Sequence, residues 1–263
     1  MKVSAIVPGF NEEKTISKVV DCLLKSPEIK EVIAINDGST DKTLTILKRF
    51  KSQIKLIDLK KNQGKGYALT AGINQAKNEV VMFIDADLVN LKQKNIEAML
   101  EPIKNHHWRA VVGIRKKSRL LPAPFARLSG ERVYYKADLL PLLPKMARSR
   151  FGVEVLLNHA LENLPTKKIT LLKLNGLYKH EKCSAAQAVK EYLDEGVEIA
   201  KELARQEKLR AEDLKIIDRL KQAASIKELQ EIVTKISNLR VREYLEKYVL
   251  KYLKKARTWW NKW

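Results

Sequence analysis

Apolar positions in the first 115 residues follow two alternating spacings. Short apolar runs predict buried strands, and apolar residues three or four positions apart predict amphipathic helices. Strands are expected at 3–7, 31–37, 54–59, 80–84 and 110–114, and helices near 16–24, 41–50, 67–76 and 95–104. This order predicts an α/β fold with a mostly parallel, doubly wound sheet flanked by helices.

The pattern becomes less regular after residue 115, so we expect a change of organisation there. Ser129–Arg132 is expected to begin an excursion, a segment that leaves the sheet and passes over the site. A helix is predicted at 151–161 and a strand at 168–174. Capping-box patterns at Ser184–Gln187 and Ser225–Glu228 open a helical tail of about three helices. The expected boundaries are therefore a main domain over 1–183 and a helical, basic tail over 184–263.

Composition narrows the classes of partner. The formal charge is +20, which suits nucleic acid, an anionic membrane surface or an anionic substrate, although a solvated lysine-rich surface is the commoner outcome. Nucleic acid is disfavoured, because no zinc-finger spacing, RNA-binding aromatic signature or Walker loop occurs. No apolar run approaches the roughly 18 residues of a membrane span. With two cysteines and no secretory signal pattern, we expect a cytoplasmic location.

The last 23 residues carry their own pattern. From Val241 to Trp263, apolar residues recur at three- and four-residue spacing, basic residues fill the positions between, and the segment ends in tryptophans. This is the composition of an interfacial helix, which would place the protein peripherally on the inner face of a membrane. The alternative is that the apolar stripe packs on the main domain or on a second subunit of a homodimer.

Two acids end the most apolar strand. Asp85 and Asp87 follow the run 80–84 and are separated by one residue. Carboxylates this close favour a hard divalent cation such as Mg²⁺ or Mn²⁺ between them. An acidic turn without a metal is the alternative, since Asp is common in turns.

Polar groups recur wherever a predicted strand meets its following loop. They lie in the segments 8–13, 36–41, 64–66 and 85–87. In a parallel sheet these loops share one edge, where ligands of open α/β sheets bind. One cleft would then hold acceptors for a base and ribose, a lysine for phosphate, and an acid pair for a metal.

The segments VPGFNEE, INDGSTDKT, NQGKGYALTAG and FIDADL resemble successive motifs of family 2 glycosyltransferases with the GT-A fold. The resemblance covers about residues 1–115 and implies that 1–183 is a catalytic domain that uses a nucleotide-diphosphate sugar. It also implies that Asp87 ligates the metal and acts in catalysis. The nucleotide-binding residues that it implies are Pro8, Asn11, Glu12, Asp37, Ser39, Lys65, Gly66 and Asp85.

The second half resembles glucosyl-3-phosphoglycerate synthases in the order of its motifs. The matching segments are 129–132, 150–157 (which contains Gly-Val-Glu at 152–154) and 178–180. Polyprenyl-phosphate glycosyltransferases share the first half. The likeness implies that Glu154 holds donor-sugar hydroxyls, and that His180 is a further metal ligand. It places Gly130, Glu131 and Arg132 at the acceptor, which would be a phosphorylated small molecule or a polyprenyl phosphate. If this likeness is set aside, the alternative interpretation is that Glu154 is an exposed acid on a helix and that His180 is a surface residue that caps a helix.

The implied reaction leaves its stereochemistry open. An inverting enzyme needs a carboxylate base at the acceptor hydroxyl, for which Glu131 and Asp138 are the nearest candidates. A retaining enzyme needs none, and the Gly-Val-Glu likeness favours retention. The rival interpretations are a catalytically degenerate sugar-nucleotide-binding protein and a nucleotidyltransferase, although the loop after the first strand lacks the glycine-rich, arginine-containing form usual in the latter.

Overall fold

The structure is a computed structural model that describes the chain except for residues 105–106, 116–127, 172–173, 178, 183, 210, 224, 252 and 254–263. The chain forms two compact units. The first contains residues 1–150 and 157–177, and the second contains residues 151–156 and 178–263. The predicted boundary at 183 stays a prediction.

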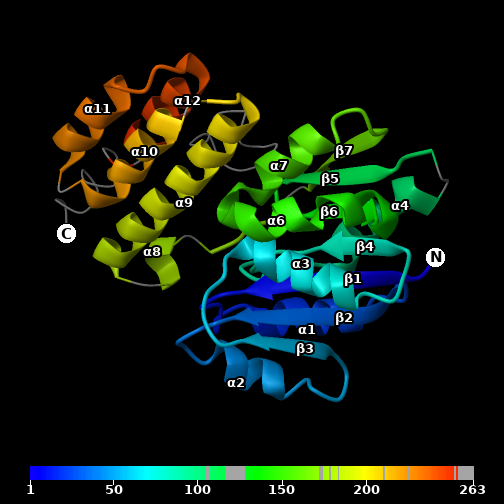
Figure 1. Ribbon diagram of the computed structural model, residues 1–263. Coiled ribbons are helices and arrows are strands. Elements are labelled where there is room, and N and C mark those ends of the chain that lie inside the picture. Colours follow the sequence, from blue (N-terminus) through cyan, green and yellow to red (C-terminus); the bar gives the residue numbers. More distant parts are fainter. Residues whose placement is uncertain are drawn as a thin grey trace. The chain divides into compact units, whose positions relative to one another are not determined.

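A seven-stranded sheet forms the centre of the first unit in the described part of the chain (Figure 1). Its order is β3-β2-β1-β4-β6-β5-β7, in which β6 runs antiparallel to both neighbours and the remaining pairs are parallel. The predicted mostly parallel sheet is therefore confirmed. The strands are β1 (Val3–Gly9), β2 (Ile29–Asp37), β3 (Lys55–Leu59), β4 (Val80–Phe83), β5 (Ala110–Arg115), β6 (Arg132–Tyr135) and β7 (Thr166–Leu171).

The helices of the first half lie where the apolar spacing predicts them, with shifts of a few residues at their ends. They are α1 (Ile16–Leu24), α2 (Thr43–Lys48), α3 (Lys65–Gln75) and α4 (Gln93–Lys104). Beyond β6 follow α5 (Lys136–Leu139), η2 (Leu140–Leu142), α6 (Leu143–Ser149), η3 (Arg150–Gly152) and α7 (Val153–Ala160).

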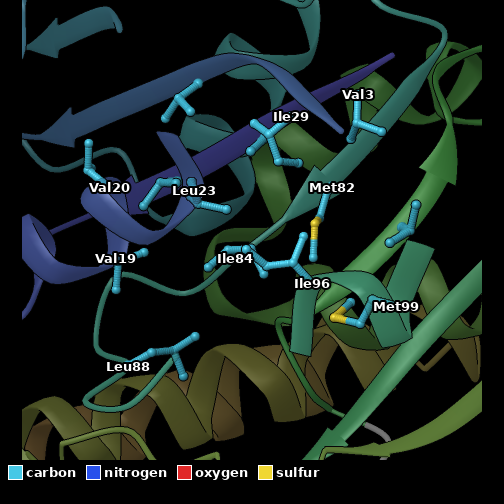
Figure 2. Packing of buried hydrophobic residues seen from close by; sticks show 14 of the residues in the cluster. Val3, Val19, Val20, Leu23, Ile29, Met82, Ile84, Leu88, Ile96 and Met99 are labelled. Carbon is cyan, nitrogen blue, oxygen red and sulfur yellow. The ribbon is translucent and has the colours of Figure 1, made fainter. Parts of the chain in front are cut away.

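Alternating side chains of the sheet bury both of its faces. Figure 2 shows one face, where Val3 and Met82 lie with Leu23 of α1 and Ile96 of α4 in a single apolar cluster. The opposite face meets α3, since a Cβ built on Gly72 would lie 2.5 Å from Cγ2 of Ile6. Burial on both faces explains why these strands are continuous apolar runs.

Strand β6 corrects the sequence analysis. An excursion was expected from Ser129–Arg132, but Arg132–Tyr135 pairs with both β4 and β5 inside the sheet. Four residues are too few to establish a period, and a buried arginine hides the apolar signal. Strand β7 is described over Thr166–Leu171, and residues 172–173 of the expected strand 168–174 lie outside the described residues.

The second unit is helical in its described residues. It contains α8 (Lys179–Lys182), α9 (Ala185–Gln206), α10 (Ala211–Arg219), η4 (Leu220–Gln222), α11 (Ile226–Thr234), α12 (Leu239–Tyr244) and the π-helical turn η5 (Leu245–Leu250). Both predicted caps are confirmed: the Ser184 hydroxyl accepts from the Gln187 amide at 3.4 Å, and Ser225 accepts from Glu228 at 3.1 Å. There are more helices than the three expected, because short breaks divide the apolar stripes.

The described part of the apolar stripe at the end of the chain is buried within this unit. Val241, Leu245, Val249 and Leu253 are each less than 5% exposed, and η5 contacts α9 and α11. Between 241 and 253, the described positions of the stripe therefore pack on helices of the same unit, a partner that neither interpretation named. Trp259, Trp260 and Trp263 lie outside the described residues. No described helix is long and apolar enough to cross a membrane.

Candidate functional site

Strand register brings the predicted loops to one edge of the sheet. Gly9 at the end of β1 pairs with Asn36 of β2, and the Ile84 amide donates to the Ile6 carbonyl at 3.1 Å. The segments that follow β1, β2 and β4 therefore leave the sheet side by side. This is the carboxyl edge, as predicted.

The first two loops are joined by hydrogen bonds. The amide of Asn11 donates to Oγ of Ser39 at 3.0 Å, and Oδ1 of Asn11 accepts from the Thr40 amide at 2.9 Å. The Glu12 amide donates to Oγ1 of Thr43 at 2.7 Å. Asn11 has a φ of 56°, a left-handed conformation that Asn tolerates better than most residues. The structure thus brings the predicted residues Asn11, Glu12 and Ser39 together. Pro8 lies in β1, three positions before Asn11.

Asp37 fastens the loop that precedes α3. Its Oδ1 accepts from the Gln63 amide at 2.7 Å and its Oδ2 from the Gly64 amide at 2.9 Å. Gly64 has a φ of +93°, which favours glycine at this turn. Burial raises the pKa of Asp37, and the two amides and the nearby Arg150 charge act against that rise. Asp37 therefore shapes the loop that carries Lys65.

Lys65 and Asp85 form an ion pair across the edge. Nζ of Lys65 lies 2.6 Å from Oδ1 of Asp85, and each side chain is 16% exposed. The neighbouring Gly66 is confined by α6, since a Cβ there would lie 2.1 Å from the Met146 carbonyl oxygen. The predicted phosphate-binding lysine is therefore in contact with Asp85, the first acid of the pair.

Gly130 lies directly against Asp85. A Cβ on Gly130 would come within 2.2 Å and 2.4 Å of the two carboxylate oxygens. From the sequence, this glycine was expected at an acceptor. Its observed neighbour is Asp85, so Gly130 limits where the Asp85 carboxylate can lie.

Glu131 and Arg132 face inward. Glu131 is 0% exposed and accepts a short hydrogen bond from the Ser129 hydroxyl. The Arg132 guanidinium is also buried and donates to the Ser129 carbonyl, the Tyr134 hydroxyl and Oδ1 of Asn158. Neither side chain reaches solvent in this structure, so their predicted contact with an acceptor stays a prediction. What the hydrogen bonds do is hold the turn that carries Gly130.

Asp87 and Leu88 pair with residues 176–177, which come shortly before His180 in the sequence. The Leu177 amide donates to the Asp87 carbonyl at 2.9 Å, and Leu88 forms an antiparallel bridge with Gly176. His180 lies in α8, but its side chain is outside the described residues. Among the described side chains, no three His, Cys, Asp or Glu residues gather as a metal site. The metal roles of Asp87 and His180 therefore stay predictions.

Glu154 belongs to the second unit and is 8% exposed, so it is not the exposed helical acid of the alternative interpretation. Its segment packs on α9, because a Cβ on Gly152 would lie 2.6 Å from Cβ of Glu202. Its role toward a donor sugar stays a prediction.

Sequence reasoning missed Arg150. Its guanidinium donates to Oδ1 of Asn62 at 3.1 Å, across 88 positions of the chain. The only available signal was its place before the Gly-Val-Glu segment, and that gives no hint of Asn62. The basic residues Lys116, Lys117 and Arg119 lie outside the described residues.

The donor set suits a hard cation. Asp85 and Asp87 offer carboxylate oxygens at the end of β4, which are the ligands that Mg²⁺ and Mn²⁺ prefer. An acid pair beside a lysine can hold a diphosphate through the cation and the ammonium together.

Comparison with known proteins matches residues 4–156 to the model of glycosyl transferase family 2. Poly-beta-1,6-N-acetyl-D-glucosamine synthase from Staphylococcus epidermidis is 31% identical over 166 residues, covering 52% of this chain and 40% of that protein. Dodecaprenyl-phosphate galacturonate synthase from Rhizobium johnstonii is 29% identical over 127 residues, covering 45% and 37%. The chain thus matches about two fifths of the length of these relatives.

Among solved structures, glucosyl-3-phosphoglycerate synthase from Mycobacterium tuberculosis is similar in fold. One structure gives a TM-score of 0.60 at 19% identity, covering 80% of this chain and 81% of that chain. Another, in complex with Mn²⁺, uridine-diphosphate-glucose and glycerol 3-phosphate, gives 0.55 at 21% identity, covering 74% and 79%. The likeness supports the expected GT-A fold.

Proposed function

The chain belongs to glycosyl transferase family 2, and from this premise we propose that it transfers a sugar from a nucleoside-diphosphate sugar to an acceptor hydroxyl or phosphate. The observation that carries the proposal is the meeting of Asp37, Lys65 and Asp85 at the carboxyl edge of the sheet. A nucleoside pocket, a phosphate-binding cation and a metal-binding acid then adjoin one another in the order that such a donor requires.

The first two loops form the nucleoside end of the proposed site. Asn11, Glu12 and Ser39 would line the base and ribose, with Pro8 at the end of β1 closing the pocket. The backbone amides of Asn11 and Glu12 already donate to Oγ of Ser39 and Oγ1 of Thr43, so the loops are preorganised. A preorganised pocket binds at a lower entropic cost.

Asp87 and His180 would hold the divalent metal, with Asp85 beside them. A bound Mg²⁺ or Mn²⁺ would supply Lewis acidity to the departing diphosphate. Lys65 would add an ammonium where negative charge develops.

We propose a retaining outcome, since both candidate bases are engaged elsewhere. Glu131 is buried against Ser129. Asp138 accepts from Arg109 at 3.1 Å and 2.5 Å. A general base must come within hydrogen-bond reach of the acceptor hydroxyl, and these contacts leave neither carboxylate poised for it. Glu154 would instead bind donor-sugar hydroxyls.

We propose a phosphorylated acceptor, either a small molecule or a polyprenyl phosphate. Dodecaprenyl-phosphate galacturonate synthase, whose name contains a polyprenyl phosphate, and the fold neighbour crystallised with glycerol 3-phosphate motivate these two classes. The +20 charge suits an anionic acceptor. Peripheral attachment of a cytoplasmic protein to a membrane would fit the lipid class. It would use Trp259, Trp260 and Trp263 rather than the buried stripe before them.

A donor screen tests the proposal. Binding and hydrolysis of UDP-, GDP-, ADP- and dTDP-sugars are measured with and without Mn²⁺. One preferred donor whose binding needs the metal is the expected result and would identify the base. Metal-dependent binding without turnover on any acceptor would favour a degenerate sugar-nucleotide-binding protein. No binding by any donor would overturn the proposal.

A further inference from the structure

The carboxyl end of α6 grips the loop that carries Lys65. At Gly64, a Cβ would lie 2.9 Å from Cβ and 3.0 Å from Cα of Arg150. At Gly66, a Cβ would meet the Met146 carbonyl oxygen and the Ser149 hydroxyl, at 2.1 Å and 2.6 Å. The two glycines on either side of Lys65 thus contact the last residues of α6 and Arg150, which follows that helix directly.

Arg150 is held in an uncommon backbone conformation at this contact. Its φ is 48° and its ψ is −118°, a combination that L residues rarely adopt. Such conformations are strained and persist only where surrounding contacts impose them. The imposing contacts are the packing on Gly64 and the hydrogen bond from the guanidinium to Oδ1 of Asn62 at 3.1 Å.

The loop 62–64 is therefore held by contacts from two sides. Asp37 binds the amides of Gln63 and Gly64 from the sheet, while Arg150 binds the Asn62 side chain and covers Gly64 from α6. The charge of Arg150 also favours the ionised form of Asp37. Lys65 follows immediately as the first residue of α3, and its ammonium lies on Asp85.

We propose that Arg150 is a positioning residue for the donor diphosphate. It fixes the loop 62–64 and so sets where the Lys65 ammonium lies relative to Asp85. The inference rests on the proposed function and deepens it, because it assigns to α6 a part in binding the nucleotide. Arg150 acts through the loop and need not touch the donor.

The test compares five variants with the wild type, the fifth being Arg150→Lys. Arg150→Gly removes the side chain and suits the positive φ, so it should fold; Asn62→Ala removes the partner; the double variant completes a cycle. Arg148→Ala is the matched control, because Arg148 is an exposed arginine at the end of α6, two residues before Arg150. Titration calorimetry with Mn²⁺ measures the Kd of the nucleoside diphosphate that the wild type binds, and thermal unfolding reports on the fold.

We expect Arg150→Gly to raise that Kd about tenfold, Asn62→Ala to raise it by a similar factor, and the double variant to be no worse than either. The donor KM should rise more than kcat falls, while Arg148→Ala matches the wild type. Arg150→Lys keeps the charge and should restore part of the affinity. Wild-type affinity in Arg150→Gly, or additive effects in the cycle, would overturn the inference alone. Failure of the wild type to bind any nucleoside diphosphate would overturn the proposed function and this inference together.

Discussion

The ammonium of Lys65 lies 2.6 Å from Oδ1 of Asp85, so the first residue of α3 is paired with the first acid beyond β4. Asp85 is also proposed to lie beside the metal ion. The Lys65 ammonium and the metal ion would therefore compete for the same carboxylate. The strength of the nucleotide and metal sites is therefore coupled through this pair.

Replacing Lys65 with alanine should separate the two effects. We expect donor affinity to fall about tenfold, because a phosphate partner is lost, while Mn²⁺ binds Asp85 more tightly, because its competitor is gone. The unfolding free energy should fall by about 1–2 kcal/mol. Manganese titration followed by electron paramagnetic resonance measures the metal, and Lys61→Ala, at an exposed lysine of the same loop, is the control. Weaker Mn²⁺ binding would contradict the prediction.

Asp87→Ala should abolish metal-dependent turnover of the donor and leave the protein folded. Its carboxylate is the proposed direct metal ligand, and such a ligand is not replaced by water without loss of the cation's position. Turnover in the presence of Mn²⁺ and a thermal unfolding curve are measured together. Glu101→Ala, at a side chain 64% exposed on α4, gives the baseline. Full activity in Asp87→Ala would remove the metal assignment.

Gly130→Ala should be far more harmful than its size suggests. The added Cβ would lie 2.2 Å and 2.4 Å from the oxygens of Asp85, so the carboxylate must move. Misplacement of about 1 Å at a reacting centre can cost on the order of 100-fold in rate, and we expect a loss of that order in kcat/KM. Gly9→Ala controls for stability, since its Cβ would meet nothing nearer than 3.5 Å. Unchanged activity would show that the position of Asp85 does not matter.

The stability contributed by Asp37 should depend on pH in a defined direction. Its pKa is raised in the folded state by burial, so its contribution is complete below the unfolded value of about 3.9 and is lost as the pH rises through the raised value. We therefore expect the unfolding free energy of the wild type, relative to Asp37→Asn, to decrease over the range in which the pH rises from about 3.9 through the raised pKa of Asp37. Urea unfolding across this range measures the difference. A difference that increases with pH would contradict the direction of the shift.

Removing residues 254–263 should release the protein from anionic vesicles if the membrane proposal holds. This cut spares Val241, Leu245 and Val249, whose burial means that a longer deletion would expose the core of the second unit. Co-sedimentation with vesicles of phosphatidylglycerol and phosphatidylcholine measures binding, with phosphatidylcholine alone as the control. If the full chain does not sediment with either, the tail does not bind lipid.

The sequence by itself determined the α/β class, the parallel core of the sheet and the edge at which the site lies. Apolar runs and helical spacing are local, so 80–84 could be recognised as a strand that delivers Asp85 and Asp87 to its carboxyl end. Both serine caps were also readable, because a capping box spans only four residues.

Only the tertiary structure decided which groups meet. The contact of Arg150 with Asn62, the approach of Gly130 to Asp85 and the burial of Arg132 in β6 each join residues from different parts of the fold or hide a charge in a strand. The stripe from Val241 to Leu253 had two interpretations for the same reason: an amphipathic pattern shows that one face needs cover, and the packing of α9 and α11 against it supplies that cover.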